Sequence, residues 1–275
     1  MNKSAIEWCD KTWNPITGCL HNCEYCYARY FTNRFDGKRY WETDIANGFA
    51  KCSFNERTGL SLPTLNEPLY GVDINSKTRK LSFPYNFYPT FHRYRLDQPA
   101  KIKKPQTIFV GSMCDLFGEW VPDKWIEEVF KSCEAAPQHR YLFLTKNQIR
   151  YMDYNDTKKS PYWLGATATT VASAHAAMRD LNSFNANTFL SLEPLLENIN
   201  LLDLHYFDSV KWVIIGAMTG PGSKYHQPKQ EWVSDIVDAC RAANVPVFLK
   251  NNLAKVWGEP LIQEFPFQAI YSRST

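Results

Sequence analysis

The sequence predicts an α/β fold whose parallel sheet is rolled into a barrel or partial barrel. First, short and almost continuously apolar runs recur from residue 108 onward, as expected for parallel strands covered on both faces. Second, amphipathic segments alternate with these runs at a spacing of roughly 25 to 45 residues, which is typical of βαβ units. Third, the pattern contains about six or seven such units, which favours a barrel over a short open sheet.

The apolar runs give the expected strands, and the segments between them give the expected helices. We expect strands at residues 12–17, 108–111, 141–145, 163–166, 188–192, 212–216 and 247–250. The apolar stripes predict a helix that begins at Pro122–Asp123, a second over 171–181, and a third over 229–243 that Asn244 ends.

Residues 32–106 interrupt this rhythm. The stretch is rich in Asn, Pro, Gly, Tyr and Phe. We interpret it as a long insertion after the first βα unit, within a single domain that spans residues 1–275.

The composition limits the class of protein. Apolar residues make up 44% of the 275 residues and charged residues 21%, as in globular proteins. No apolar run approaches the roughly 18 residues of a membrane span, and the N-terminus lacks the apolar region of a signal peptide. We therefore expect a cytoplasmic protein without a membrane partner, in which the eight cysteines are metal ligands, catalytic groups or buried thiols.

The segment from Lys77 to Lys104 is strongly basic. It holds eight Lys and Arg against one acid, a local charge of +7 in a chain whose net charge is +3. Six aromatic residues lie among these cations: Phe83, Tyr85, Phe87, Tyr88, Phe91 and Tyr94. Cations beside rings are the two ingredients of nucleic-acid grooves, so the segment is a candidate site for a nucleic acid or nucleotide. The alternative is a solvated insertion with a small aromatic core.

Three cysteines lie close together near the N-terminus. Cys19, Cys23 and Cys26 have the spacing C-x3-C-x2-C. Three thiolates on one loop can hold three irons of a [4Fe–4S] cluster and leave the fourth iron open, as catalytic metal sites require. A zinc site that includes His21 is an alternative, although the chain lacks a second C-x2-C or H-x3-H pair. Chance clustering of buried thiols is another.

This spacing, with Tyr25 directly before the third cysteine, resembles the signature of the radical S-adenosylmethionine (SAM) superfamily. The resemblance implies a partial (βα)6-type TIM barrel whose cluster loop follows the first strand. It implies that the open iron binds SAM, and that an external flavodoxin- or ferredoxin-type reductant supplies one electron. Cleavage of SAM would then give a 5′-deoxyadenosyl radical that abstracts hydrogen from a substrate.

Further blocks resemble a phage-associated family of radical-SAM-like proteins. They are residues 6–15, 18–19, 26–28, 111–117, 144–146, 192–196, 216–221 and 248–250. Cys9 and Met218 depart from that family's pattern, and the resemblance specifies no substrate.

The resemblance places SAM at the C-terminal ends of the strands, where parallel barrels hold their active sites. The expected cofactor-binding residues are Tyr25, Ser112, Asp115, Thr145, Thr167, Thr169, Ser191, Glu193, Gly216 and Ala217. Ser112 and Asp115 match the motif that holds the SAM ammonium, although a helix cap or surface turn is an alternative for Asp115. Thr167 and Thr169 match the position that bonds the ribose. Gly216 and Ala217 would let the backbone approach the adenine.

Three residues are candidates for catalysis. The Cys114 thiol could donate a hydrogen atom to a substrate radical, as in a lyase of the same superfamily, and Cys9 could do the same. Glu193 lies between Leu192 and Pro194, where a carboxylate is costly to bury without a partner, so we expect it to hold SAM or substrate. Lys250 ends the last strand and is either a solvated lysine or the partner of a phosphate. Cys52, Cys133 and Cys240 are expected to be buried thiols without a catalytic role.

Taken together, these features predict a radical SAM enzyme that modifies or repairs a nucleobase in a nucleic acid or nucleotide. The alternative is a non-catalytic, zinc- or cluster-containing nucleic-acid-binding protein.

Overall fold

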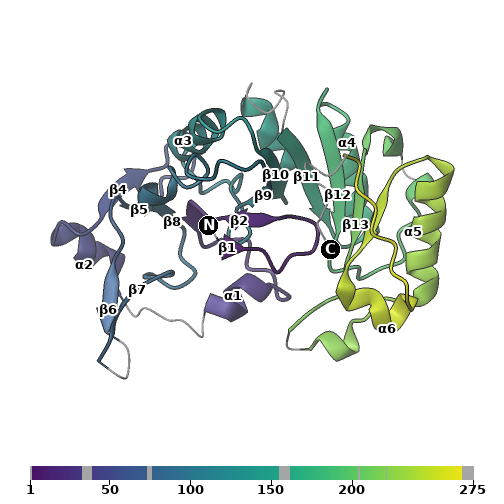
Figure 1. Ribbon diagram of the computed structural model, residues 1–275, viewed down its shortest axis with the longest axis horizontal. Helices are drawn as coiled ribbons and strands as arrows, with labels where there is room; N and C mark the ends of the chain where they lie inside the picture. The colour runs from purple at the N-terminus through teal and green to yellow at the C-terminus, as the bar shows by residue number, and fades with distance from the viewer. Residues whose placement is uncertain are drawn as a thin grey trace.

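A curled sheet of parallel strands organises the computed structural model, which describes residues 2–32, 39–72, 76–154, 162–203, 205–220 and 222–267 (Figure 1). Over these residues the sheet has the order β1-β2-β9-β10-β11-β12-β13-β14. Only β1 is antiparallel to its neighbour there, and the other seven strands form a half-barrel. The strands are β1 (Asn2–Lys3), β2 (Lys11–Trp13), β9 (Thr107–Val110), β10 (Arg140–Thr145), β11 (Tyr162–Ala168), β12 (Asn187–Leu192), β13 (Val213–Ile215) and β14 (Val247–Leu249). The α/β class and the partial barrel agree with the prediction.

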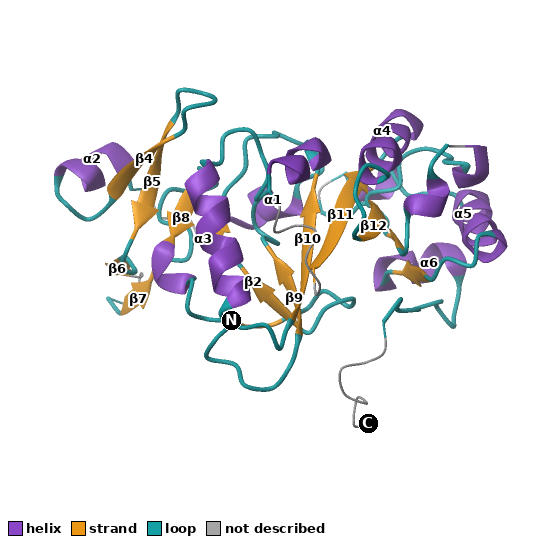
Figure 2. Ribbon diagram, turned by 90° about the horizontal axis from the view of Figure 1, so that it is seen from above, coloured by secondary structure: helices purple, strands orange, loops and turns teal. Residues whose placement is uncertain are grey.

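Three amphipathic helices cover the outer face of this sheet (Figures 1 and 2). They are α3 (Asp123–Glu134), α4 (Val171–Leu181) and α5 (Gln230–Ala242). Each buries its apolar stripe in the same core as the outward side chains of the strands. All three lie within a residue or so of their predicted positions, and Asn244 follows α5 with a φ of 54°.

The remaining helical segments are short. They are α1 (Tyr27–Thr32), α2 (Trp41–Ala46), α6 (Ala254–Trp257), η1 (Arg93–Arg95), η2 (Gln148–Asp153), η4 (Leu201–Asp203), η5 (Phe207–Ser209), η6 (Ser223–Tyr225) and η7 (Asn251–Leu253). None of the described helices has the length and apolar character that a membrane crossing requires.

A second, aromatic core fills the inside of the half-barrel. Alternate residues of the strands point inward and bury large rings, among them Phe109, Trp163, Phe189 and Trp212. Gly165 makes room for one of them, because a Cβ at this position would lie 2.2 Å from the ring of Phe189. Both ends of the chain complete this core. Trp8 comes from the N-terminal segment, and Phe265 and Phe267 come from the C-terminal segment.

The first expected strand, residues 12–17, is in fact two strands. β2 ends at Trp13, and β3 (Ile16–Thr17) belongs to a different sheet. Pro15 explains the break, because proline has no N–H to continue a ladder. The other expected strands lie within two residues of the observed bounds.

Most of residues 32–106 lies outside the main sheet. With β3 from the N-terminal part, this segment builds a small sheet of order β3-β8-β5-β4, and it also forms a hairpin, β6-β7, at one end of the molecule (Figure 1). The strands are β4 (Lys51–Phe54), β5 (Ser61–Leu65), β6 (Tyr70–Val72), β7 (Thr78–Lys80) and β8 (Thr90–His92). The single domain over 1–275 stays a prediction.

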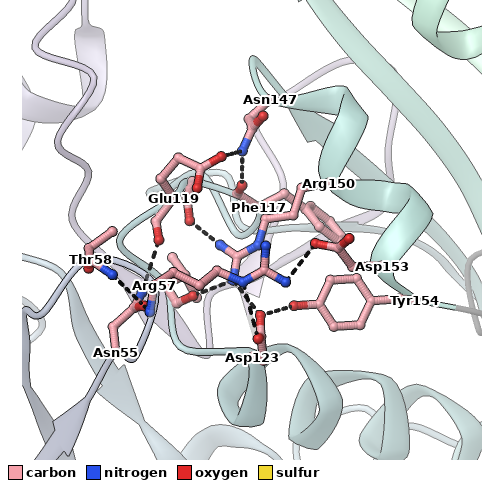
Figure 3. Close-up of polar contacts among 12 residues, drawn as sticks. Asn55, Arg57, Thr58, Phe117, Glu119, Asp123, Asn147, Arg150, Asp153 and Tyr154 are labelled. Atoms are coloured by element: carbon pink, nitrogen blue, oxygen red, sulfur yellow. Dashed lines mark hydrogen bonds and ion pairs between the residues drawn. The ribbon is translucent and has the colours of Figure 1, made fainter.

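A polar network attaches this segment to α3 and η2 (Figure 3). Arg57 pairs with Asp123 at 3.2 Å and with Asp153 at 2.9 Å. The buried Arg150 donates to Asp123 at 2.7 Å, and the Tyr154 hydroxyl donates to it at 2.6 Å. Burial raises the pKa of Asp123, but the hydrogen bonds from Tyr154, Arg150 and Arg57 outweigh this and lower it.

Candidate functional site

A cavity of about 390 Å³ opens at the C-terminal ends of the parallel strands. It is lined by residues 5–8, by the cysteine loop, and by strand ends from β9 to β14. Most of the predicted site residues line it: Cys19, Cys23, Tyr25, Cys26, Ser112, Cys114, Asp115, Thr145, Thr167, Ser191, Glu193, Ala217 and Lys250. Thr169 and Gly216 do not. Thr169 lies instead just before α4, and its amide donates to Ser173 Oγ at 3.0 Å.

Backbone contacts fix the cysteine loop between β9 and the inserted segment. The amide of Gly18 donates to the carbonyl of Met113 at 2.9 Å, and the amide of Cys19 donates to that of Phe87 at 3.2 Å. Gly18 has a φ of +89°, and a Cβ there would lie 2.4 Å from the carbonyl oxygen of Tyr88. Only glycine fits this position.

The three thiols share a partly exposed environment beside one cation. Cys19, Cys23 and Cys26 are all of intermediate exposure. The amide of Arg29 donates to the sulfur of Cys26 at 3.4 Å, and its guanidinium donates to the Cys19 carbonyl at 3.1 Å. Burial raises the pKa of the Cys19 thiol to about 12. Metal binding at this thiol must therefore displace a proton.

The geometry does not favour the zinc alternative. Within the described residues, no three His, Cys, Asp or Glu side chains are grouped to hold a metal ion. His21 is engaged elsewhere, because its Nε2 lies 2.7 Å from Asp115 Oδ2.

Asp115 joins three parts of the site. Its side chain is buried and accepts hydrogen bonds from His21 Nε2, from Thr145 Oγ1 at 2.6 Å and from the amide of Lys146 at 2.9 Å. Burial raises the pKa of this carboxyl, but the bonds from His21, Lys146 and Thr145 lower it overall. Asp115 therefore positions the cysteine loop against β9 and β10. It also begins a turn, in which its Oδ1 accepts the amide of Phe117 at 3.1 Å, but this turn is buried at that residue.

Tyr25 and Ser112 have partners at the cavity edge. The Lys146 ammonium donates to the Tyr25 hydroxyl at 2.9 Å. The hydroxyl of Tyr27 donates to the Ser112 carbonyl at 2.7 Å. These contacts tie the cysteine loop to the ends of β9 and β10.

Two asparagines hold strand ends in place and were missed from the sequence. Asn14 Oδ1 accepts the amide of Met113 at 2.9 Å. Asn252 bonds both backbone groups of Ala217, at 3.1 and 2.8 Å. Asn14 lies in the block 6–15, and Asn252 lies just after the block 248–250, which was a signal in the sequence. Only the folded chain shows which backbone groups the two side chains reach.

Glu193 and Lys250 form an ion pair across the ends of β12 and β14. Their side chains are 27% and 15% exposed, so both reach the cavity. Gly216 lies behind them, and a Cβ there would lie 3.0 Å from atoms of both side chains. Gly216 therefore makes room for the ion pair.

Two buried polar atoms that line the cavity have no partner among the described residues. Ser191 is 1% exposed, and its Oγ has no hydrogen bond. Trp8 is 2% exposed, and its Nε1 likewise has none. Buried polar groups are nearly always bonded, so these two atoms suit a ligand with polar edges.

A family model described as a protein of unknown function (DUF5131) matches residues 3–264. The chain belongs to this family. No curated protein matches the DUF5131 chain. A solved structure of spore photoproduct lyase complexed with dinucleoside spore photoproduct is similar, with a TM-score of 0.46 and 10% identity, over 94% of this chain and 77% of that one. The predicted association with phage stays a prediction.

The other thiols of the DUF5131 chain differ in their surroundings. Cys114 lines the cavity, and burial raises its pKa well above the ordinary value, so the thiol keeps its proton. Cys9 does not line the cavity, and it donates to Ser4 Oγ at 3.2 Å. Cys133 and Cys240 are buried as predicted. The prediction for Cys52 is wrong, because it is exposed on the edge strand β4.

The aromatic residues of the basic segment form a core instead of a stacking surface. Phe83, Tyr85, Phe87 and Phe91 are buried, and Tyr88 and Tyr94 are half-buried. Arg93 binds Glu128, and Arg95 donates to the Asn14 carbonyl at 2.9 Å. Most of these rings are therefore packed inside the fold, as the alternative of a small aromatic core predicts, whereas Phe87 also lines the cavity. Exposed cations remain, among them Arg79 and Lys103.

Proposed function

We propose that this DUF5131 protein is a radical SAM enzyme in which Cys19, Cys23 and Cys26 hold a [4Fe–4S] cluster. One observation carries the proposal: the three thiols of a C-x3-C-x2-C loop line the same cavity as the polar strand ends of a curled parallel sheet. When bound together and reduced, the cluster and SAM supply the one-electron chemistry that removes hydrogen from a substrate.

The chain's own residues orient the loop and lower the cost of its charge. The backbone contacts of Gly18 and Cys19 fix the loop. The contact between His21 and Asp115 fixes the part of the loop between Cys19 and Cys23. The guanidinium of Arg29 lies beside the loop and offsets the negative charge of three thiolates.

The remaining cavity residues are proposed to hold SAM and substrate. These residues line the cavity near the thiols or at the strand ends: Ser112, Thr145, Thr167, Ala217 and Tyr25. The aromatic core below them excludes water. Thr169 and Gly216 do not line the cavity, and their proposed role is to position the residues next to them, Ser173 for Thr169 and the Glu193–Lys250 pair for Gly216. The protonated thiol of Cys114 can give a hydrogen atom to a substrate radical.

The proposed substrate is a nucleobase in DNA, RNA or a nucleotide. The exposed cations of Lys77–Lys104 support contacts to phosphate, and the aromatic side chains of the same segment have no role in these contacts. A flavodoxin- or ferredoxin-type protein is the proposed source of the electron.

Anaerobic reconstitution with iron and sulfide tests the proposal. We expect about four irons and four acid-labile sulfides per chain, and we expect 5′-deoxyadenosine after addition of dithionite and SAM. Cys19→Ala, Cys23→Ala and Cys26→Ala should each lose the product, whereas Cys52→Ala, which changes an exposed thiol outside the cavity, should keep it.

The same measurement addresses the alternative. Bound zinc without acid-labile sulfide, together with no 5′-deoxyadenosine, would refute the enzyme and favour a zinc-containing nucleic-acid-binding protein.

A further inference from the structure

Two walls of the cavity differ in how their charged side chains are used. On the wall nearer the cysteine loop, His21 bonds Asp115 and Lys146 bonds Tyr25. A second wall is formed by the ends of β12 and β14. Within the described part of the chain, the side chains of Glu193 and Lys250 there bond only each other. The charged side chains of the first wall are bonded to other parts of the protein. Those of the second wall have hydrogen-bonding atoms left for a ligand.

That remaining capacity consists of two ammonium donors beside one carboxylate oxygen. An ammonium has three donors and a carboxylate has two oxygens, and the mutual contact uses one of each. Both side chains are partly exposed and line the cavity. A ligand edge with an N–H next to an acceptor can therefore bond both without breaking the ion pair.

Gly216 keeps this pair at the cavity surface. It follows β13, which pairs with both β12 and β14. A Cβ on Gly216 would lie 3.0 Å from Glu193 Cγ and from Lys250 Cδ. The two side chains therefore pack against Gly216, where a larger residue would crowd them.

Ser191 adds a third polar group on the same wall. It lies near the end of β12, Glu193 directly follows that strand, and both residues line the cavity. Its buried hydroxyl has no partner and can donate or accept. The adjacent lining is apolar and partly aromatic, with Trp8, Phe109 and Leu144, and it suits a flat ring.

We propose that Ser191, Glu193 and Lys250 bind the lactam edge of a nucleobase, the ring N–H beside a carbonyl found in uracil, thymine and guanine. Glu193 accepts from the ring N–H, Lys250 donates to the carbonyl, and Ser191 bonds the neighbouring group. The ring N–H of this edge is more acidic than the amino N–H of cytosine or adenine, so its hydrogen bond to the charged Glu193 carboxylate is stronger and this edge is preferred. This inference rests on the nucleobase substrate proposed above and narrows it.

Calorimetric titration of the full-length chain with nucleosides, without added iron, tests this wall. We expect uridine and guanosine to bind, and 3-methyluridine, which lacks the ring N–H, to bind at least about tenfold more weakly. Glu193→Gln and Lys250→Met should each weaken uridine by about tenfold. Lys229→Met, which changes an exposed lysine paired with Glu231, is the matched control and should leave the affinity unchanged.

The outcomes separate this inference from the enzyme proposal. Equal binding of uridine and 3-methyluridine, or no binding of either, overturns it. So does a loss of SAM binding in Glu193→Gln with unchanged uridine binding, which would assign the wall to the cofactor. If a chain that forms no cluster still binds uridine more tightly than 3-methyluridine, the result would support the base-binding site and refute the proposal of a radical SAM enzyme.

Discussion

At the scale of single residues, the missing side chain of Gly18 determines where the three thiols can lie. Its backbone adopts a left-handed conformation under the carbonyls of Phe87 and Tyr88. A side chain here would have to displace backbone, which cannot move as a flexible side chain does.

Gly18→Ala is therefore expected to destabilise the fold and to disturb iron binding. Left-handed strain costs roughly 1–2 kcal/mol, and the overlap with Tyr88 adds to it. Urea unfolding and iron content after reconstitution measure the two effects. Gly48→Ala is the control, because Gly48 has a φ of +76° but a Cβ there meets nothing within 4 Å. It should show the strain alone, and equal iron content in both variants would contradict the prediction.

Local spacing predicted many residues of the site, but not their partners. Ser191 and Glu193 stand close together at the end of a predicted strand, and the cysteine spacing is visible in a single line of sequence. The use of Asp115 was not predictable, because His21, Thr145 and Lys146 reach it from distant parts of the chain. Gly216 was assigned to adenine for the same reason, since its contact with Glu193 and Lys250 depends on three strands at once.

At the scale of elements, Asp123 links the start of α3 to the inserted segment through Arg57, and to η2 and the residue after it through Arg150 and Tyr154 (Figure 3). Its folded-state pKa is below the ordinary value, because these hydrogen bonds outweigh burial. Such a group stabilises the folded state above its unfolded pKa, roughly 4, and this contribution is lost as pH falls through the folded pKa.

Asp123→Asn should therefore be less stable than the native chain at neutral pH, and the difference should shrink as the pH falls below about 4. Thermal unfolding between neutral and acid pH measures it. Asp97→Asn removes a carboxylate from an exposed i,i+4 pair with Lys101 and should change stability by less than about 0.5 kcal/mol at any pH. A constant difference for Asp123→Asn across the range would count against this account.

The elements of the half-barrel were predictable because their pattern is local. Buried parallel strands produce continuous apolar runs, and the helices that cover them show a 3.6-residue period. The inserted strands produce no such signal. β5 pairs with the preceding strand β4 and also with β8, which lies farther along the chain. The rings between Phe83 and Tyr94 are buried by these distant contacts, so their local mixture with cations suggested a surface that the fold covers.

At the scale of the whole molecule, the two ends of the described chain close the inside of the half-barrel. Trp212 contacts Trp8, Phe265 and Phe267, with ring centroids 6.3, 5.7 and 5.6 Å apart. An open half-barrel would otherwise leave the large rings of its inner face in water.

Phe265→Ala combined with Phe267→Ala should destabilise the whole sheet. We expect a loss of about 2–5 kcal/mol, as large-to-small changes at packed rings cause, and a melting temperature lower by several degrees. Calorimetry measures both. Phe54→Ala, at a ring that is 60% exposed, should have little effect. An equal shift in the two variants would show that the terminal rings do not seal the core.

The carbonyl of Phe87 that receives the amide of Cys19 also bears on modularity. The inserted segment forms part of the wall behind the thiol loop, and Gly18 fits only because that backbone is already there. The segment cannot be excised or exchanged as an independent module. A chimera that replaced residues 39–106 would have to return a carbonyl to Cys19 and leave the space beside Gly18 as narrow as it is now.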